Sequence, residues 1–199
     1  MENNLLLATH NEHKVHEISL LFSEACLPYH VQSLCDIDDS VPIPEDGATL
    51  EENAIFKARE GYKRHGGNVL ADDTGLEVRA LGGRPGVYTA RYAGEQCTAD
   101  ENITKLLHEL RDSNDRDATF KTVLALILNG QEYLFVGEVH GQITSSRRGE
   151  RGFGYDPIFQ PEGTDKTFAE LSEHDKNQIS HRGRAIMKLI AFLRERSNI

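Results

Sequence analysis

Residues 118–139 read ATFKTVLALILNGQEYLFVGEV, and this stretch decides the class of fold. Two apolar segments, Ala118 to Leu128 and Glu132 to Val139, flank the dipeptide Asn129-Gly130. An Asn-Gly pair between apolar runs is the strongest short-range signal for a two-residue hairpin turn. We therefore expect a long antiparallel hairpin in this part of the chain.

Strand and helix signals alternate on both sides of the hairpin. The expected elements are a strand at 5–9, a helix capped by Asn11, a helix from Thr49 to about Gly66, a strand at 68–71 that runs into Asp72-Asp73, and helices at 99–110 and 181–196. For Thr49, Glu52 three residues later predicts a capping box. The pattern predicts a mixed α/β sheet flanked by helices, in a single domain over residues 1–199.

Composition narrows the classes of function. The 199 residues carry a net charge of −10, which argues against broad binding to duplex nucleic acid. No apolar run approaches the ~18 residues that a membrane span needs. Cys26, Cys35 and Cys97 show no CxxC spacing, so free thiols in a reducing compartment are expected. The start of the chain lacks the basic residues of a signal peptide, and we expect a cytoplasmic protein.

The segment from Thr9 to Lys14 lies where a strand turns into a helix. Backbone N–H groups and the helix dipole make such a position an anion site. Thr9 and Asn11 add side-chain donors, and Lys14 adds a charge for a phosphate. The alternative is an ordinary strand-to-helix turn with a capping residue.

Asp72 and Asp73 follow the apolar residues Val69-Leu70-Ala71 directly. Adjacent carboxylates at the end of a buried strand repel each other and lose hydration, and a hard cation relieves both costs. Mg²⁺ takes oxygen ligands, often one or two carboxylates together with substrate phosphates. The alternative is a turn rich in Asp and Gly. Glu45 and the polar pair Asn53 and Lys57 are candidates for the same site.

Two later segments supply further candidate site residues, one with aromatic rings and the other with cationic side chains. In GFGYDP, residues 152–157, glycines allow close backbone approach and an aromatic ring can stack on a base, although both rings could instead fill the core. In KNQISHR, residues 176–182, Ser180 can cap the last helix, and His181 and Arg182 then lie at the positive end of its dipole. An anionic ligand would make that placement favourable. The alternative is a solvated helix start.

Five segments together resemble the motifs of a known family. Ala8–Glu17 resembles its opening ATGNxxKxxE, and Glu51–Ala58 resembles its ENAxxKA helix. In this chain ADDTGLEVRALGGRPGVYTARYAG (residues 71–94) resembles the central signature, and GFGYDPIF (152–159) and KNQISHRGRA (176–185) resemble the last two. The chain resembles the inosine triphosphate pyrophosphatase family, also called noncanonical purine NTP pyrophosphohydrolases, from Leu5 to Leu193. This resemblance implies an elongated α/β fold with two lobes and a central substrate cleft, usually in a homodimer. It also implies hydrolysis of ITP, dITP and XTP to the monophosphate and pyrophosphate with Mg²⁺.

By motif position, the resemblance makes Asp73 the general base and a metal ligand, with Glu45 and Asp72 as further candidate ligands. The substrate-binding set that we predict is Thr9, His10, Asn11, Glu12, His13, Lys14, Asn53, Lys57, Thr74, Phe153, Gly154, Tyr155, Asp156, Lys176, His181 and Arg182. Asp73 would activate a water that attacks the α-phosphorus. Donors such as His181 and Arg182 would select the 6-oxo group of hypoxanthine and xanthine over the amine of adenine.

The chain departs from the family pattern at two positions. His10 replaces the usual Gly, and if that Gly needs a positive φ, His10 must adopt one. Thr74 replaces the commoner Ser and keeps the hydroxyl. Two other interpretations stay open: a Maf-like pyrophosphatase for other modified nucleotides, and a nucleotide-binding regulator without turnover.

Overall fold

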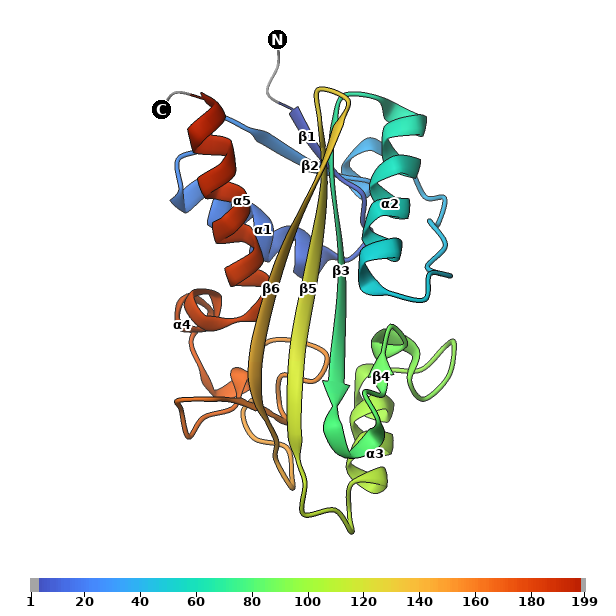
Figure 1. Ribbon diagram of the computed structural model, residues 1–199, viewed down its shortest axis with the longest axis vertical. Coiled ribbons are helices and arrows are strands. Elements are labelled where there is room, and N and C mark those ends of the chain that lie inside the picture. Colours follow the sequence, from blue (N-terminus) through green and yellow to red (C-terminus); the bar gives the residue numbers. More distant parts are fainter. Residues whose placement is uncertain (1–3, 198–199) are drawn as a thin grey trace. The chain divides into compact units, whose positions relative to one another are not determined.

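The computed structural model describes residues 4–197 and contains a mixed β-sheet with helices beside it (Figure 1). Its elements are β1 (Asn4–Leu7), α1 (Glu12–Glu24), β2 (His30–Ser33), α2 (Leu50–His65), β3 (Asn68–Val78), β4 (Pro85–Gly86), α3 (Ala99–Glu109), β5 (Asp117–Leu128), β6 (Gln131–Ile143), β7 (Phe159–Pro161), α4 (Glu173–Ile179) and α5 (His181–Ser197). The strand order is β2-β1-β3-β5-β6-β7, and β4 pairs with β3. Because β1 is parallel to β2 and β3 whereas β7 is antiparallel to β6, the predicted mixed sheet is confirmed.

The hairpin that decided the fold class is present. Strands β5 and β6 are joined at Asn129-Gly130, where both residues have positive φ, 52° and 77°. This is the geometry that favours Asn-Gly in a two-residue turn. The second strand continues to Ile143, four residues beyond the predicted end at Val139.

The chain divides into two compact units, each with its own core. Unit 1 comprises the described parts of residues 1–73, 122–137 and 183–199, and unit 2 comprises residues 74–121 and 138–182. In unit 1, the apolar stripes of α1 and α5 pack against alternate residues of β1, β3 and β5, such as Leu5, Leu70 and Leu124. In unit 2, aromatic residues dominate a core that includes Phe120 and Phe159.

The helix starts near the candidate site follow the sequence signals. The Asn11 side chain caps α1, and Thr49 Oγ1 accepts a hydrogen bond from Glu52 N at 3.1 Å at the start of α2. The predicted capping box is only half formed, because the Glu52 carboxylate accepts from Ala48 N, at 2.7 Å, one residue before the cap. Helix α2 ends at His65, and the two glycines after it have positive φ, as expected for a helix stop.

The predicted end of the third strand is wrong. Strand β3 does not stop at Ala71 but continues to Val78, so Asp72 and Asp73 lie within the strand instead of in a turn. Pairing of Leu76 and Glu77 with the two residues of β4 extends the ladder through the Thr-Gly sequence that looked like a turn. Since successive side chains of a strand point to opposite faces, the two carboxylates must diverge.

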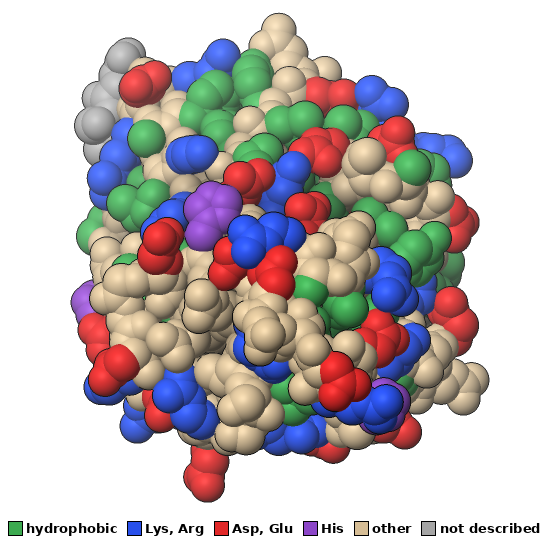
Figure 2. Space-filling view, turned by 60° about the horizontal axis from the view of Figure 1, so that its bottom comes forward, with side chains coloured by type: hydrophobic (Ala, Val, Ile, Leu, Met, Phe, Trp, Pro, Cys, Tyr) green, Lys and Arg blue, Asp and Glu red, His purple; other side chains and the backbone are tan. Residues whose placement is uncertain are grey.

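The molecular surface mixes charges of both signs. On the face shown in Figure 2, the described Lys and Arg side chains are interspersed with Asp and Glu and form no continuous basic area. This agrees with the argument from net charge against a broad nucleic-acid interface. Over residues 4–197, every helix is too short or too polar to cross a membrane.

Candidate active site

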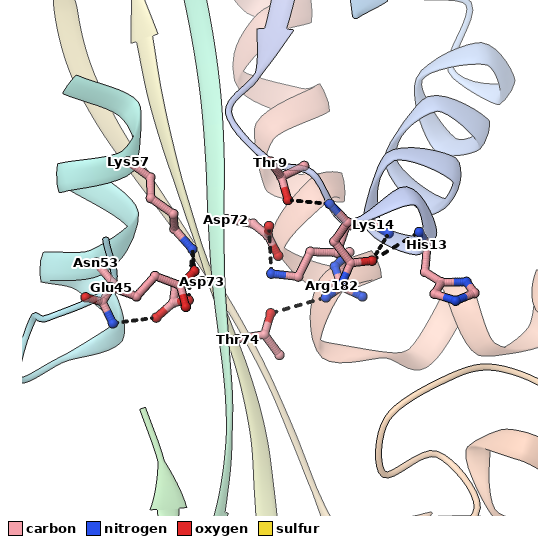
Figure 3. A network of polar contacts seen from close by, with 11 residues as sticks. Thr9, His13, Lys14, Glu45, Asn53, Lys57, Asp72, Asp73, Thr74 and Arg182 are labelled. Atoms are coloured by element: carbon pink, nitrogen blue, oxygen red, sulfur yellow. Dashed lines mark hydrogen bonds and ion pairs between the residues drawn. The ribbon is translucent and has the colours of Figure 1, made fainter. Parts of the chain in front are cut away.

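Asp72 and Asp73 lie on opposite faces of β3, each in contact with a lysine (Figure 3). Asp73 shares its face with Val69 and Ala71, beside α2, whereas Asp72 shares the other face with Leu70, beside α1. Both carboxylates are buried, with residue exposures of 2% for Asp72 and 5% for Asp73. The polar residues around them, which are Lys14, Glu45, Asn53 and Lys57, also belong to unit 1.

The Asp73 carboxylate is held by two side chains from α2. Asn53 Nδ2 donates to Asp73 Oδ2 at 3.0 Å, and Lys57 Nζ donates to Asp73 Oδ1 at 3.0 Å. The same ammonium group donates to Glu45 Oε1 at 2.5 Å. Asn53 and Lys57 are one helical turn apart, so both reach the strand from one face of α2. The structure therefore brings Glu45, Asn53, Lys57 and Asp73 together, as predicted.

The acids of this cluster differ in proton affinity. The pKa of Asp73 is raised, mainly because the carboxyl group is buried. The positive charge of Lys57 lowers this pKa, whereas the negative charge of Glu45 raises it further. Burial also raises the pKa of Glu45, but the contact with Lys57 outweighs it and the net direction is downward. For Lys57, burial lowers the pKa, yet the three surrounding acids raise it overall, so the ammonium stays charged. Asp73 is thus a stronger base than an aspartate in water, which suits it to accept a proton.

On the other face of β3, Lys14 Nζ lies 3.0 Å from Asp72 Oδ1. The Asp72 side chain is 1% exposed and that of Lys14 is 15% exposed. This ion pair holds the Lys14 ammonium group of α1 beside the middle of β3.

The segment from Thr9 to Lys14 forms a capped helix start. Asn11 Oδ1 accepts hydrogen bonds from His13 N at 3.1 Å and Lys14 N at 3.3 Å, while Asn11 N donates to Thr9 Oγ1 at 3.2 Å. A phosphate that binds these amides must replace contacts made within the segment. Glu12 is exposed, and Figure 3 shows the imidazole of His13 directed away from Asp72.

His10 adopts no positive φ. Among the described residues, the non-glycine residues with positive φ are Cys26, Asp38 and Asn129. The exposed imidazole of His10 instead donates from Nε2 to the Asp39 carbonyl oxygen at 2.7 Å. The left-handed backbone that was considered for this position is therefore not adopted, and His10 replaces Gly without that strain.

The second half of the predicted set lies in unit 2, where a carboxylate organises the glycine-rich loop. Asp156 Oδ2 accepts from Phe153 N at 2.8 Å and from Lys176 Nζ at 2.8 Å. The Lys176 ammonium lies 4.9 Å from the centroid of the Phe153 ring, and the Arg182 guanidinium lies 5.4 Å from it. Phe153 is therefore the aromatic ring next to the cations, a suitable platform for a base. Gly154 has a φ of 60° and lies in the same turn.

Arg182 and His181 begin α5. Arg182 donates from a terminal nitrogen to Thr74 Oγ1 at 3.3 Å, which links this helix start to the residue after Asp73. Both His181 and Arg182 are buried, 3% and 2% exposed, so the alternative of a solvated helix start is excluded.

Tyr155 differs from the other predicted residues, since its ring fills the core of unit 2 and is 3% exposed. Its hydroxyl donates to the Thr89 carbonyl oxygen at 3.0 Å. For Tyr155, the core interpretation is therefore the correct one, and its contribution to a site is to anchor the loop.

One residue of the KNQISHR segment was missed as a site residue. Asn177, on α4, is 4% exposed, and its Nδ2 has no hydrogen-bond partner among the described residues. A buried amide donor without a protein partner is costly unless a ligand or water satisfies it. No signal in the sequence distinguishes Asn177 from its neighbours in the KNQISHR segment.

The predicted metal ligands do not form one group. Over the described residues, no three His, Cys, Asp or Glu side chains are arranged to hold a metal ion. Asp72 lies on the opposite face of β3, whereas Asp73 and Glu45 converge on the same ammonium group. Two carboxylates at one point fit a hard cation that takes its remaining ligands from phosphates and water.

Comparison with known proteins identifies the family. A family model described as the Ham1 family matches residues 5–192, nearly the whole chain. The chain belongs to the Ham1 family. This confirms the resemblance expected from the five motifs.

Two relatives match along nearly their full length. A protein of Flavobacterium johnsoniae named dITP/XTP pyrophosphatase is 49% identical over 189 residues, covering 95% of this chain and 97% of its own. A protein of the same name from Bacillus licheniformis is 48% identical over 192 residues, with coverages of 95% and 97%.

Two solved Ham1 structures share the fold. The Staphylococcus aureus Ham1 protein has a TM-score of 0.86 at 42% identity, covering 97% of this chain and 99% of its own. The Coxiella burnetii HAM1 protein has a TM-score of 0.88 at 41% identity, with coverages of 98% and 100%.

Proposed function

We propose that this protein is a nucleoside triphosphate pyrophosphatase that hydrolyses the noncanonical purine nucleotides ITP, dITP and XTP to the monophosphate and pyrophosphate. The observation that supports it most directly is the buried cluster in which Asp73 contacts Asn53 and Lys57 while Lys57 also contacts Glu45. Relatives that share nearly half of the sequence bear the name dITP/XTP pyrophosphatase, which supports the same substrate class.

In the proposed reaction, Asp73 accepts a proton from the water that attacks the α-phosphorus. Its raised pKa makes it the stronger base of the two acids that contact Lys57. Asn53 fixes the orientation of the Asp73 carboxylate, and Lys57 balances its charge. Lys14 supplies positive charge for the leaving pyrophosphate, which needs no general acid when cations stabilise it.

Mg²⁺ is the proposed cofactor, and Asp73 and Glu45 are the residues that would hold it. When bound, a divalent cation neutralises phosphate charge and lowers the pKa of a coordinated water. We assign Asp72 the separate task of holding Lys14, because the two form an ion pair on the other face of β3.

In the same proposal, the residues of unit 2 recognise the purine. The ring of Phe153 offers a stacking surface, and the donors of Lys176, His181 and Arg182 suit the 6-oxo group that ITP and XTP share. Adenine presents an amine there, so a site built from donors leaves unpaired groups and rejects it. We further propose a cytoplasmic homodimer, as expected from the resemblance and the free cysteines.

A pyrophosphate-release assay with ITP, run with Mg²⁺ and with EDTA, tests the proposal. We expect turnover only with the divalent cation, and higher kcat/KM for ITP, dITP and XTP than for GTP and ATP. A preference for ATP would overturn the assignment of the donor set. Turnover of modified pyrimidines in place of ITP would favour the Maf-like alternative, and binding without turnover would favour a regulator.

A further inference from the structure

The imidazole of His181 lies flat against the ring of Phe120. The two ring centroids are 4.4 Å apart and the ring planes differ by 8°. Phe120 is on β5, His181 is the first residue of α5, and both belong to unit 2. With exposures of 4% and 3%, both residues are buried.

Other aromatic rings hold Phe120 in place. Phe159 meets it edge to face, with centroids 4.7 Å apart and planes at 64°, and Phe168 lies at 6.3 Å. Phe168 also lies 6.0 Å from the His181 ring. Because a packed core leaves no space for a ring to rotate freely, this cluster fixes the plane of Phe120.

The same cluster continues to the proposed base-recognition residues. The Lys176 ammonium lies 6.0 Å from the centroid of Phe168 and 4.9 Å from that of Phe153. Arg182 reaches the Phe153 ring at 5.4 Å. The stacked pair of Phe120 and His181 is thus continuous with the donors proposed to bind the purine.

We propose that Phe120 is a positioning residue for substrate recognition, since its ring fixes the plane of the His181 imidazole. Imidazole nitrogens donate and accept hydrogen bonds in the plane of the ring. A flat stack with Phe120 therefore restricts the directions in which His181 can hydrogen-bond to a purine. This inference rests on the proposed function, and it assigns a role to a residue that lies outside the five family motifs.

Phe159 offers a matched control, because it belongs to the same core and is fully buried. Its ring contacts among the described residues are with Phe120 and Phe168 and not with His181. Phe120→Leu and Phe159→Leu remove the same atoms from the same cluster, but only the first removes the stack on His181.

The test measures kcat and KM for ITP in both variants. We expect Phe120→Leu to raise KM about five- to tenfold, the usual scale of an aromatic stacking contact, with kcat changed less than about twofold. Phe159→Leu should lower stability but change KM by less than about twofold, because Phe168 still packs against both Phe120 and His181 and keeps their stack. Phe120→Tyr keeps the stack and should restore a KM near that of the wild type. If the leucine variants do not fold, the pair Phe120→Met and Phe159→Met replaces them, because Met retains more of the volume.

Two further readouts separate positioning from general destabilisation. In a His181→Ala background, Phe120→Leu should no longer change KM, whereas independent effects would add. In NMR spectra, the His181 ring protons should show an upfield shift from the Phe120 ring, lost in Phe120→Leu and kept in Phe159→Leu.

The outcomes distinguish this inference from the proposed function. Wild-type protein that releases no pyrophosphate from ITP overturns both. Wild-type turnover, together with equal KM changes in the two leucine variants or an undiminished effect without His181, overturns only the role of Phe120.

Discussion

At the scale of single residues, the side chains around β3 show how one strand separates two tasks. Alternation directs Asp73 toward the Asn53 and Lys57 side chains and Asp72 toward Lys14. Each of the two adjacent acids is therefore in direct contact with a different lysine. The sequence shows that the two acids are adjacent. That their side chains point to opposite faces follows only once β3 is known to continue past them to Val78.

Replacing Asp73 with Asn tests the proposed base. The amide keeps nearly the same shape but cannot accept the proton, so kcat for ITP should fall at least ~100-fold, the usual scale for a lost general base. Asp72→Asn serves as the comparison, since it also removes a buried carboxylate of β3 and should act mainly on KM through Lys14. Near-normal turnover by Asp73→Asn would remove Asp73 from the role of base.

The position of Gly152 leaves no room for a side chain. A Cβ at Gly152 would lie 2.1 Å from Asp156 Oδ2, the oxygen that accepts hydrogen bonds from both Phe153 N and Lys176 Nζ. In addition, the φ angle of Gly152 is 75°, which side chains rarely allow. Gly152→Ala should therefore displace that carboxylate and raise KM for ITP by about tenfold or more, as expected for losing a charged hydrogen bond. Gly163→Ala, also at positive φ but with open space around it, should lower stability and leave KM unchanged. Equal KM values in the two variants would contradict this reasoning.

At the scale of elements, local signals predicted those parts of the fold that depend on local geometry. The Asn129-Gly130 turn, the Asn11 and Thr49 caps and the stop of α2 before two glycines were all predictable, because each needs only a few neighbouring residues. The short polar strand β2 and the second half of β3 were missed. Their hydrogen-bond partners come from β1 and β4, so tertiary pairing overrides local propensity there.

The candidate site residues were predicted from another kind of signal. Polar side chains that end up buried, such as Lys57, Lys176 and His181, conflict with ordinary packing, and motif matches identify them. Phe120 and Asn177 were missed, because a phenylalanine in an apolar strand and an asparagine near a helix cap are consistent with folding alone.

Tyr155 anchors an element, and its hydroxyl can be tested without changing the packing. Tyr155→Phe removes the hydrogen bond to Thr89 and should lower the free energy of unfolding by about 1 kcal/mol. It should also raise KM for ITP severalfold, because the anchor holds the loop that contains Phe153 and Asp156. Tyr92→Phe, which removes a hydroxyl bonded to Glu109 at 2.6 Å, should lower stability without changing KM. A KM increase in Tyr92→Phe as large as in Tyr155→Phe would argue against a specific anchor.

At the scale of the whole molecule, acid stability should depend on Asp39. Hydrogen bonds from His65 and Val41 N, with a further contact from Arg64, lower the pKa of Asp39 to about 2, compared with an ordinary value of 3.8. A depressed pKa stabilises the folded state at pH values above the ordinary one. That contribution disappears as the pH falls from about 3.8 to about 2, where the folded state also takes up the proton.

Urea unfolding between pH 6 and 2 measures this effect. The difference in unfolding free energy between the wild type and Asp39→Asn should be largest near pH 6 and should shrink between about pH 4 and pH 2. Asp38→Asn gives a neighbouring control, because its exposed side chain lies outside the described contacts of Asp39. A difference between wild type and Asp39→Asn that stays constant with pH would show that the carboxylate charge does not act in this way.

The backbone at His10 has a consequence for laboratory evolution. Hydrogen bonds to the side chains of Thr9 and Asn11 hold the turn before α1. The φ angle of His10 is negative, and any L-amino acid tolerates such an angle. Saturation mutagenesis at codon 10 should therefore yield folded proteins with almost every substitution, and such a library could be screened directly for altered nucleotide preference.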